Sequence, residues 1–380
     1  MGHDMTVLTG MPNHPYGIIH DAYKGKRLLR ENVNGVKIIR VWFYVAANKG
    51  FIKRVLSFLS FMFSAIFLGM TRLQNCDIVI ATSPQFFTAV AGLLISKFLG
   101  VPFVFEVRDI WPAEIVAVGA LRNQTLIKIL EAIELFLYKK ANMIVALAEG
   151  TIKILQKRGI PKEKIIFIPN GVDSHLFETP LSTDKTRDHL QLDGKFIISY
   201  IGTHGMAQKL ETVLFSAKNL SARNDIVFIF LGEGSEKKRL IQLAQELKLE
   251  NVIFLPQQER TKIPTFIQAS NICLVPLRNA ELFKHNIPSK IFEIMACSRP
   301  IIVGVDGESR ELVVNRAKAG IFYKPEDSVA LSSAIMKLYN DRKLSSRLGR
   351  NGQCFVNIHF DRDVLAHKYI DKLKEVVKSN

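Results

Sequence analysis

The sequence predicts an α/β protein with two doubly wound domains, each a mainly parallel sheet covered by helices. Short apolar runs rich in β-branched and aromatic residues alternate with helix-length segments along most of the 380 residues. The alternation lapses between residues 177 and 193 into Thr, Pro, Ser, Asp and Lys, which indicates an interdomain linker. We therefore expect an N-terminal domain over residues 1–182, a C-terminal domain over 183–361, and a helix over 362–380 that packs back toward the first domain.

The first half begins with a predicted strand at residues 5–9. Further strands are expected at 77–81, 102–106, 143–147 and 165–168, separated by helices at 88–99, 126–141 and 150–158. Strands that alternate with helices of this length indicate βαβ units in a parallel sheet. A doubly wound domain ordinarily begins with a strand, a glycine-rich turn and a helix. Nothing ahead of residue 5 supplies them, so we expect that one such unit is absent.

A second alternation follows the linker. Its expected strands lie at 196–201, 226–231, 252–255, 272–275 and 300–303, and its helices at 210–220, 235–247, 263–269, 289–297, 328–340 and 362–377. Open parallel sheets bind ligands at the carboxyl ends of their strands. We therefore expect two domains that face each other across a ligand-binding cleft.

The segment 51–70 is the most membrane-like part of the chain. Its apolar-plus-serine part is shorter than the roughly 20 residues that a spanning helix needs. A narrow polar stripe of Lys53 and three serines leaves a wide apolar face, which is typical of a helix lying in a bilayer surface. The same pattern also fits a helix packed on the sheet of its own domain. We name as candidate membrane and acceptor contacts Lys53, Arg54, Phe58 and Phe61.

The composition narrows the class of protein. Apolar residues make up 48% and charged residues 23%, which excludes disordered, collagen-like and coiled-coil chains. The net charge of +16 predicts an anionic partner: nucleic acid, an acidic lipid surface or a phosphorylated small molecule. No nucleic-acid recognition motif is visible. Four scattered cysteines form neither a disulfide framework nor a zinc motif, and a reducing cytoplasm is the simplest setting.

Two glycine turns follow predicted strands of the second half. Gly202 and Gly205 let the backbone and a helix N-terminus approach an anion, with Lys209 nearby as a positive charge. Gly232 and Gly234 have the same setting between a strand and a helix. Each pair taken alone is better explained as a tight structural turn.

A carboxylate, Glu293, lies about one turn inside a predicted helix that starts near Pro288 and Ser289. Its neighbours are apolar, and an unpaired buried charge is costly, so this side chain needs a partner. A pair of sugar hydroxyls is one such partner, and a salt bridge on the helix surface is the alternative.

In the first half, Arg108 and Asp109 follow a predicted strand and precede Trp111 and Pro112. Polar groups of active sites gather at such strand ends. A structural Arg–Asp pair is the alternative interpretation.

Taken together, these motifs resemble family 4 glycosyltransferases of the GT-B fold, and in particular the bacterial surface-polysaccharide branch that includes N-acetylfucosamine transferases and colanic acid glycosyltransferases. The resemblance runs nearly end to end. It is carried by the segments 7–15, 106–112, 169–173, 202–209, 232–234 and 288–293.

The resemblance implies a retaining transfer of a sugar, usually without a metal ion, from a nucleotide-sugar donor held by the second half. Glu293 resembles the second glutamate of the family's E-x7-E motif and would bind the ribose hydroxyls. The loop from Gly202 through Thr203, His204 and Gly205 would hold the diphosphate. The implied donor-binding residues also include Gly232, Gly234, His285, Pro288, Ser289 and Lys290, and the implied catalytic residues are Arg108, Asp109 and Lys209.

Three departures accompany the resemblance. His285 stands at the first E-x7-E position, and Arg108 stands where many relatives carry histidine. Family members also begin one strand and one glycine-rich loop earlier. The leading hypothesis is an enzyme at the inner face of the plasma membrane that moves an N-acetylated amino sugar from a UDP-sugar to a polyprenyl-diphosphate-linked glycan. The alternative is a catalytically incompetent remnant that binds nucleotide or membrane.

Overall fold

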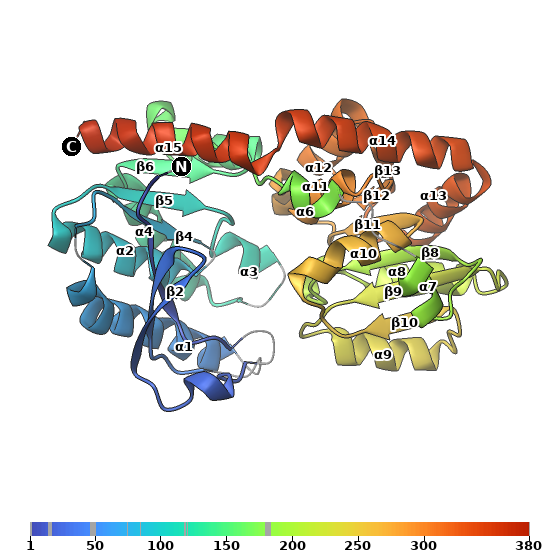
Figure 1. Cartoon of the computed structure of the whole chain (residues 1–380), viewed down its shortest axis with the longest axis horizontal. Coiled ribbons are helices and arrows are strands. Elements are labelled where there is room, and N and C mark those ends of the chain that lie inside the picture. The colour runs from blue at the N-terminus through green and yellow to red at the C-terminus, as the bar shows by residue number, and fades with distance from the viewer. Residues whose placement is uncertain are drawn as a thin grey trace. The chain divides into compact units, whose positions relative to one another are not determined.

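The protein is described here from a computed structural model that covers residues 2–13, 17–45, 51–73, 75–83, 85–117, 119, 121–178 and 184–379, without the side chains of residues 51, 52, 54, 175, 178, 184, 185 and 189. These residues form two compact units. The first comprises residues 1–147, 152–167 and 369–380, and the second comprises 148–151 and 168–368. Figure 1 shows the chain coloured from its N-terminus to its C-terminus.

The first unit contains the strands β1 (Thr6–Gly10), β2 (Leu28–Val33), β3 (Val36–Val41), β4 (Val79–Thr82), β5 (Phe103–Val107), β6 (Met143–Ala146) and β7 (Ile165–Phe167). Its helices are α1 (Phe51–Ser64), which continues through the π-helical turn η2 (Ala65–Gly69), α2 (Phe86–Leu99), α3 (Ala113–Ala117), α4 (Gln124–Lys140) and most of α5 (Glu149–Lys157). The C-terminal end of α15 (Arg362–Lys378) also belongs to this unit.

The strands of the first unit form two sheets. The order is β1-β3-β2 in one and β4-β5-β6-β7 in the other. All pairs are parallel except β2 with β3, a hairpin closed by Asn34 and Gly35, both with positive φ. The sequence predicted neither this hairpin nor the division into two sheets, although Asn-Gly between apolar runs is a strong turn signal.

A buried ion pair lies in the helical layer of the first unit. Glu134 on α4 is only 2% exposed, accepts a hydrogen bond from the hydroxyl of Tyr138 (2.6 Å), and pairs with Arg158 just beyond α5. Burial raises the pKa of the Glu134 carboxyl, and Arg158 opposes that rise. The arrangement connects α4 to the segment that follows α5.

The second unit contains the strands β8 (Phe196–Ile201), β9 (Ile226–Leu231), β10 (Val252–Leu255), β11 (Ile272–Pro276), β12 (Ile301–Gly304) and β13 (Gly320–Phe322). Its helices are α6 (Ser174–Glu178), α7 (Asp184–His189), α8 (Glu211–Asn219), α9 (Lys237–Glu246), α10 (Ile263–Ala269), α11 (Lys290–Ala296), α12 (Glu308–Arg310), α13 (Ser328–Asn340) and α14 (Arg342–His359), followed by the start of α15.

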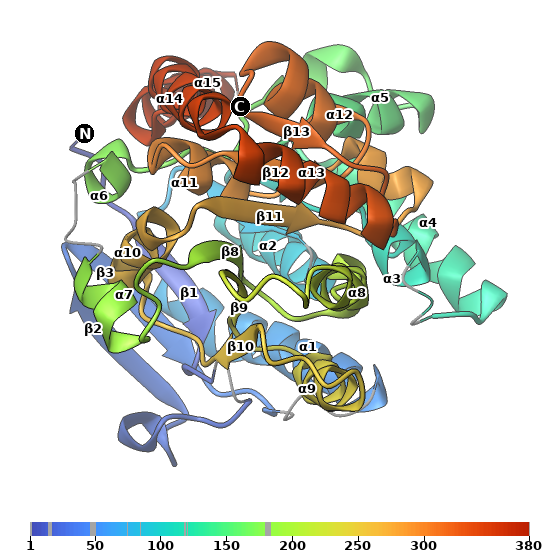
Figure 2. The same cartoon turned by 90° about the vertical axis from the view of Figure 1, so that its right-hand side faces the viewer.

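One parallel sheet runs through the second unit in the order β10-β9-β8-β11-β12-β13, which Figure 2 shows from bottom to top. This is the doubly wound arrangement, with the first strand, β8, in the middle. All five residues of β11 and all six of β9 are buried, because helices cover both faces of the sheet. The prediction of a doubly wound second domain is confirmed.

The predicted linker at 177–193 is only partly correct. Phe177 is fully buried, and α7 lies inside the predicted segment. Arg187 on α7 donates hydrogen bonds to the carbonyl of Ala269 (2.7 Å) and to the Asn271 side chain (3.1 Å), which ties this helix to the second unit. The polar residues that suggested a linker therefore belong to a surface helix, α7. Residues 179–183 lie outside the described part of the chain.

Candidate functional site

The loop after β8 turns on Gly202, whose φ of +140° favours glycine. Its N–H donates to the carbonyl of Leu231 (2.9 Å). A Cβ atom at this position would lie 2.5 Å from the Nζ atom of Lys290. The absence of a side chain at Gly202 therefore lets the ammonium of Lys290, from a distant part of the sequence, lie against the loop.

The second glycine loop packs against the first, backbone to backbone. Gly232 has a φ of +145°, and a Cβ atom there would lie 2.0 Å from the carbonyl oxygen of Gly202. A Cβ atom on Gly234 would lie 2.2 Å from the carbonyl oxygen of His204. Both loops follow neighbouring strands, β8 and β9, at the carboxyl edge of the sheet. The predicted glycine turns are thus brought together, and Gly202, Gly232 and Gly234 each have a packing reason to be glycine.

The imidazole of His204 is withdrawn from this loop into the core. It is fully buried beside the rings of Tyr200, Phe230 and Phe254, and neither ring nitrogen has a hydrogen-bond partner among the described residues. Burial, with a smaller effect of Lys237, lowers its pKa to about 4. The expectation that the His204 side chain contacts a donor is therefore wrong, because the whole residue is buried beneath the loop surface.

Lys290 begins α11, and its side chain is half-buried. The Nζ atom lies 4.0 Å from the centre of the Tyr200 ring. Burial lowers the pKa of this ammonium to about 7, whereas Glu293 acts in the opposite direction. An anion bound beside Gly202 would therefore stabilise the charged form of Lys290.

Lys209, which the resemblance put in the place of a phosphate ligand, is directed elsewhere. Its backbone is left-handed, with a φ of +49°, and its Nζ atom lies 3.5 Å from Oε1 of Glu211. Glu211 also pairs with Arg239. Lys290 rather than Lys209 is the ammonium found beside Gly202, and a catalytic role for Lys209 stays a prediction.

Glu293 already has a partner within the protein. Its Oε1 atom lies 3.0 Å from Nη2 of Arg260, and the carboxylate is 18% exposed. The guanidinium of Arg260 also lies over the ring of Phe177, 5.8 Å from its centre. The alternative of an ion pair is thus what the structure contains, and ribose binding by Glu293 stays a prediction.

The remaining predicted donor residues flank α11. Ser289 is exposed at the N-cap, and the carbonyl of Pro288 accepts from the N–H of Ile291 (3.0 Å). His285 lies in the preceding turn, with Nδ1 3.9 Å from Oε1 of Glu308. Thr203 is exposed on the Gly202 loop, where its carbonyl accepts from the hydroxyl of Tyr200 (2.7 Å).

Arg108 and Asp109 lie in the first unit, directly after β5. The hydroxyl of Ser83 accepts from the N–H of Asp109 (3.1 Å) and donates to its carbonyl (3.0 Å), which fixes this turn. Burial raises the pKa of the Asp109 carboxyl, and a hydrogen bond with Glu114 and the charge of Arg108 oppose that rise. Arg108 itself lies 3.8 Å from Oε1 of Glu106. Sequence reasoning did not find Ser83, because nothing in its local sequence marks it.

The orientation predicted for the segment 51–70 is wrong in part. The serines of the polar stripe point inward: Ser57 and Ser64 are buried, and Ser60 accepts from the N–H of Tyr44 (2.8 Å). Phe61, a proposed membrane contact, is 8% exposed and packs edge-on against Phe43.

Other apolar side chains of α1 and η2 face outward instead. Leu56 is 50% exposed, Phe63 52% and Phe67 69%, whereas Phe58 is half-buried and Lys53 is exposed. The side chain of Arg54 lies outside the described part of the chain. The helix over residues 55–72 is long and apolar enough to cross a membrane, a test that core helices of soluble proteins also pass.

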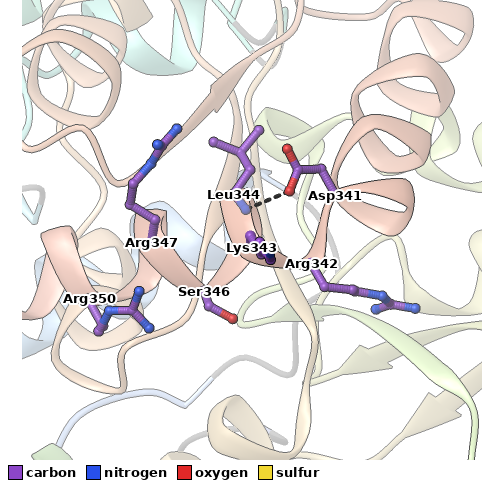
Figure 3. A pocket seen from close by; sticks show the side chains of 7 residues that line it. All are labelled: Asp341, Arg342, Lys343, Leu344, Ser346, Arg347 and Arg350. Carbon is purple, nitrogen blue, oxygen red and sulfur yellow. Dashed lines mark hydrogen bonds between the residues drawn. The ribbon is translucent and has the colours of Figure 1, made fainter.

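A surface hollow of about 630 Å³ lies at the start of α14. Figure 3 shows Arg342, Lys343, Arg347 and Arg350 around it, with Asp341 accepting from the N–H of Leu344. It contains none of the predicted donor residues. No group of three His, Cys, Asp or Glu side chains able to hold a metal ion is found in the part of the chain that the structure describes.

Comparison with known proteins decides the family. The profile of the glycosyl transferase 4-like domain matches residues 1–171, and the profile of glycosyl transferases group 1 matches residues 182–354. The chain belongs to the group 1 glycosyltransferases. This group 1 glycosyltransferase is 25% identical, over 343 residues, to WcaI of Escherichia coli strain K12, a glycosyl transferase named for colanic acid biosynthesis; the match covers 88% of the chain and 84% of WcaI.

Solved structures agree on the fold of this glycosyltransferase. Sucrose-phosphate synthase from Thermosynechococcus elongatus superposes with a TM-score of 0.78 at 18% identity, covering 99% of this chain and 89% of the synthase. Anabaena HepE, solved in complex with UDP and glucose, superposes with a TM-score of 0.71 at 19% identity, covering 88% of this chain and 86% of HepE. The predicted GT-B class is confirmed, and the chain is related to enzymes of surface polysaccharide synthesis.

Proposed function

We propose that this glycosyltransferase moves a sugar, an N-acetylated amino sugar in our preferred version, from a UDP-sugar to a polyprenyl-diphosphate-linked glycan. The product would enter exopolysaccharide, capsule or O-antigen lipopolysaccharide. The kinship with WcaI supports the pathway class, and the UDP bound to HepE supports the nucleotide. The observation that carries the proposal is the half-buried Lys290 ammonium held against Gly202 at the carboxyl edge of the second sheet.

The chemistry proposed for this site rests on the leaving group. Diphosphate departs more easily when positive charge and N–H dipoles already surround it in a site that excludes water. Lys290 supplies the charge, and the Gly202 loop permits close backbone approach. Glu293 would then exchange its bond to Arg260 for the ribose hydroxyls. Retention of the anomeric configuration follows from the family, and we expect transfer to continue in the presence of EDTA.

Radiolabelled UDP-N-acetylglucosamine and UDP-glucose, each with a polyprenyl-diphosphate-linked acceptor, test this proposal. We expect labelled lipid product from the native chain and little from Gly202→Ala, whose methyl group would displace the Lys290 ammonium. Gly194→Ala is the matched control, because Gly194 also has positive φ but no atom lies within 4 Å of its Cβ position. Equal loss of product in both variants would show that backbone strain, and not the position of Lys290, causes the effect.

A second candidate function is nucleotide binding without transfer. The division of the first unit into two sheets favours it, because the second unit, with the glycine loops, is an uninterrupted sheet. In that case UDP-glucose would bind, and Lys290→Met would weaken binding, while no acceptor would be glycosylated. Detecting labelled lipid product would reject this candidate.

We also propose that the protein binds the cytoplasmic face of the plasma membrane through α1 and η2. Leu56, Phe63 and Phe67 present an apolar strip to the solvent. Trp42 and Tyr44 are 45% and 40% exposed, and Tyr44 is bonded to α1 through Ser60. Aromatic side chains of this kind favour the membrane interface, and the net charge of +16 attracts anionic lipids.

Sedimentation with phosphatidylglycerol vesicles tests the membrane proposal. We expect the double variant Phe63→Ser/Phe67→Ser to bind these vesicles at least about tenfold more weakly, because two phenylalanine side chains leave the apolar phase. The control Val329→Ser/Ile358→Ser removes two side chains of similar exposure, 67% and 71%, from the second unit. Equal vesicle binding by the two double variants would show that α1 and η2 do not form the membrane contact.

A further inference from the structure

The strands β4 and β5 of the first unit are joined beyond the last pair of their ladder. They run parallel and pair as far as Thr82 and Glu106. The next residue after β4 is Ser83, whose N–H donates to the carbonyl of Glu106 (3.0 Å). Because the carboxyl ends of parallel strands meet at one edge of a sheet, Ser83 lies beside the residues that follow β5.

The hydroxyl of Ser83 uses its full capacity for hydrogen bonds. Its oxygen accepts from the N–H of Arg108 (2.9 Å) and from the N–H of Asp109 (3.1 Å), and the hydroxyl donates to the carbonyl of Asp109 (3.0 Å). A hydroxyl has one hydrogen to donate and two lone pairs that accept. All three partners are backbone groups, so this contact fixes the path of the chain at Asp109.

This hydroxyl is also shielded from water. Ser83 is 4% exposed, so water has little access to the backbone groups that lose a partner when the hydroxyl is removed. A second buried serine of the first unit, Ser96, bonds within its own helix, where it donates to the carbonyl of Leu93 (2.9 Å). The partners of Ser83 lie 25 and 26 residues away in the chain. The Ser83 hydroxyl therefore joins two separate segments.

The carboxyl of Asp109 is held by a second segment, the helix α3. It is hydrogen-bonded to Glu114 on this helix. The N–H of Glu114 donates to the carbonyl of Ile110 (3.0 Å), so the chain turns into α3 directly after Asp109. Asp109 is thus held by its backbone at Ser83 and by its side chain at Glu114. Removing the Ser83 hydroxyl would release the backbone, and the carboxyl would shift with the turn.

We propose that Ser83 is a positioning residue for sugar transfer, which fixes the backbone at Asp109 so that the Asp109 carboxyl keeps the place that the transfer step needs. This role rests on the proposed function and on the catalytic role predicted for Asp109. Ser83 acts through Asp109 and does not itself contact the substrate. A displacement of about 1 Å in a reacting group can lower a rate about 100-fold. The predicted donor residues lie in the second unit, so we expect donor binding to be unchanged.

Steady-state transfer from radiolabelled UDP-glucose or UDP-N-acetylglucosamine to a polyprenyl-diphosphate-linked acceptor tests this role. Ser83→Ala should lower kcat about 100-fold, which corresponds to about 2.7 kcal/mol of barrier, while the donor KM stays within about twofold. The control Ser96→Ala removes a hydroxyl from a residue that is 2% exposed, and its kcat should stay near the native value. Equal losses of kcat in the two variants, or a donor KM that rises in parallel with the loss of kcat, would overturn the proposal.

A double-mutant cycle with Asp109→Asn shows whether Ser83 acts through Asp109. Residues that act as a unit have strongly non-additive effects. In the Asp109→Asn background, Ser83→Ala should therefore lower kcat by less than about threefold. A further loss of about 100-fold would show that Ser83 acts independently of Asp109, which contradicts the proposal.

Amide hydrogen exchange separates the role of Ser83 from the proposed function. The N–H groups of Arg108 and Asp109 are bonded to the Ser83 hydroxyl, so their exchange should be at least about tenfold faster in Ser83→Ala and unchanged in Ser96→Ala. Equal exchange in Ser83→Ala and the native chain overturns the proposal, whether or not the native chain makes lipid product. If the native chain makes no product with either donor, the proposed function fails, and faster exchange at these two amides still supports the contact.

Discussion

Replacing Lys290 by methionine is expected to weaken donor binding while stabilising the folded protein at neutral pH. Methionine keeps most of the length of the side chain and its apolar contact with Tyr200 but removes the charge. No hydrogen bond from the Nζ atom is found among the described residues, so the ammonium is free to serve a ligand. A donor diphosphate therefore gains a charged contact without breaking one in the protein.

The size of the effect follows from the position of this ammonium. A hydrogen bond to a charged group is worth about 1.5–3 kcal/mol. Loss of that contact in Lys290→Met would weaken UDP-glucose binding by roughly 10- to 150-fold. Lys209→Met is the matched control, because the Lys209 ammonium already lies beside Glu211, and we expect it to change the affinity little.

The pH dependence has a defined sign. In the free protein the pKa of Lys290 is about 7, and a bound diphosphate raises it, so the donor binds together with a proton. Affinity for UDP-glucose should therefore fall above pH 7, by up to about tenfold per pH unit. In the unfolded chain the pKa returns to 10.5. Burying the charged Lys290 side chain lowers the free energy of unfolding by its full amount below pH 7, and this destabilisation disappears as the pH rises toward 10.5. Lys290→Met should therefore be more stable than the native chain at neutral pH.

Titration calorimetry at pH 6.5, 7.5 and 8.5 in buffers of different ionisation enthalpy measures affinity and proton uptake together. Urea unfolding at the same pH values measures stability. The reasoning is refuted if the native chain shows the same affinity at all three values, or if Lys209→Met loses as much affinity as Lys290→Met. A variant at Lys290 that is less stable at neutral pH would also contradict it.

Three further predictions concern other charged groups. If the Glu293 carboxylate binds ribose, Glu293→Gln should weaken UDP-glucose binding about tenfold in calorimetry. Arg260→Met removes only the ion-pair partner of Glu293 and should leave UDP-glucose binding intact. Unchanged binding in both variants would show that the ion pair is purely structural. Arg158→Met should lower the free energy of unfolding in urea by about 3 kcal/mol at pH 7, because Glu134 is left buried without a counter-charge. Burial raises the pKa of the Glu134 carboxyl, so the carboxyl becomes neutral more readily at pH 5 and the loss of stability should be smaller there. An equal loss of stability at both pH values would contradict this. Asp109→Asn should lower the rate of product formation with little change in donor affinity. A parallel loss of rate and donor affinity would show that Asp109 does not have a specifically catalytic role.

Much of the second unit could be predicted from local sequence. The strands β8, β9 and β10 and the helices α10 and α13 begin and end at the predicted residues. Strands buried on both faces form short continuous apolar runs, which are visible without knowledge of their neighbours. The hairpin of β2 and β3 was missed because β2 contains Arg30, Glu31 and Asn32 and has three of its six residues exposed, even though Asn34 and Gly35 marked the turn.

The helix α1 shows where local pattern stops being informative. Its periodicity correctly separated a serine stripe from an apolar face, but periodicity does not say which side meets the core. The core side was decided by Tyr44 and Phe43, which bond and pack against Ser60 and Phe61. A serine can turn inward at little cost when its hydroxyl finds a backbone partner there.

The sequence by itself determined the class of this protein: an alternation of strands and helices with glycine turns at strand ends, and a set of motifs specific enough to indicate a family. Only the tertiary structure decided that Lys290 and not Lys209 lies against Gly202, that Glu293 is paired with Arg260, and that the strands of the first unit form two sheets. The reason is physical. Strand and helix signals arise from neighbours a few residues apart, whereas the partner of a charge or of a strand edge is chosen by packing between segments that lie tens of residues apart in the chain.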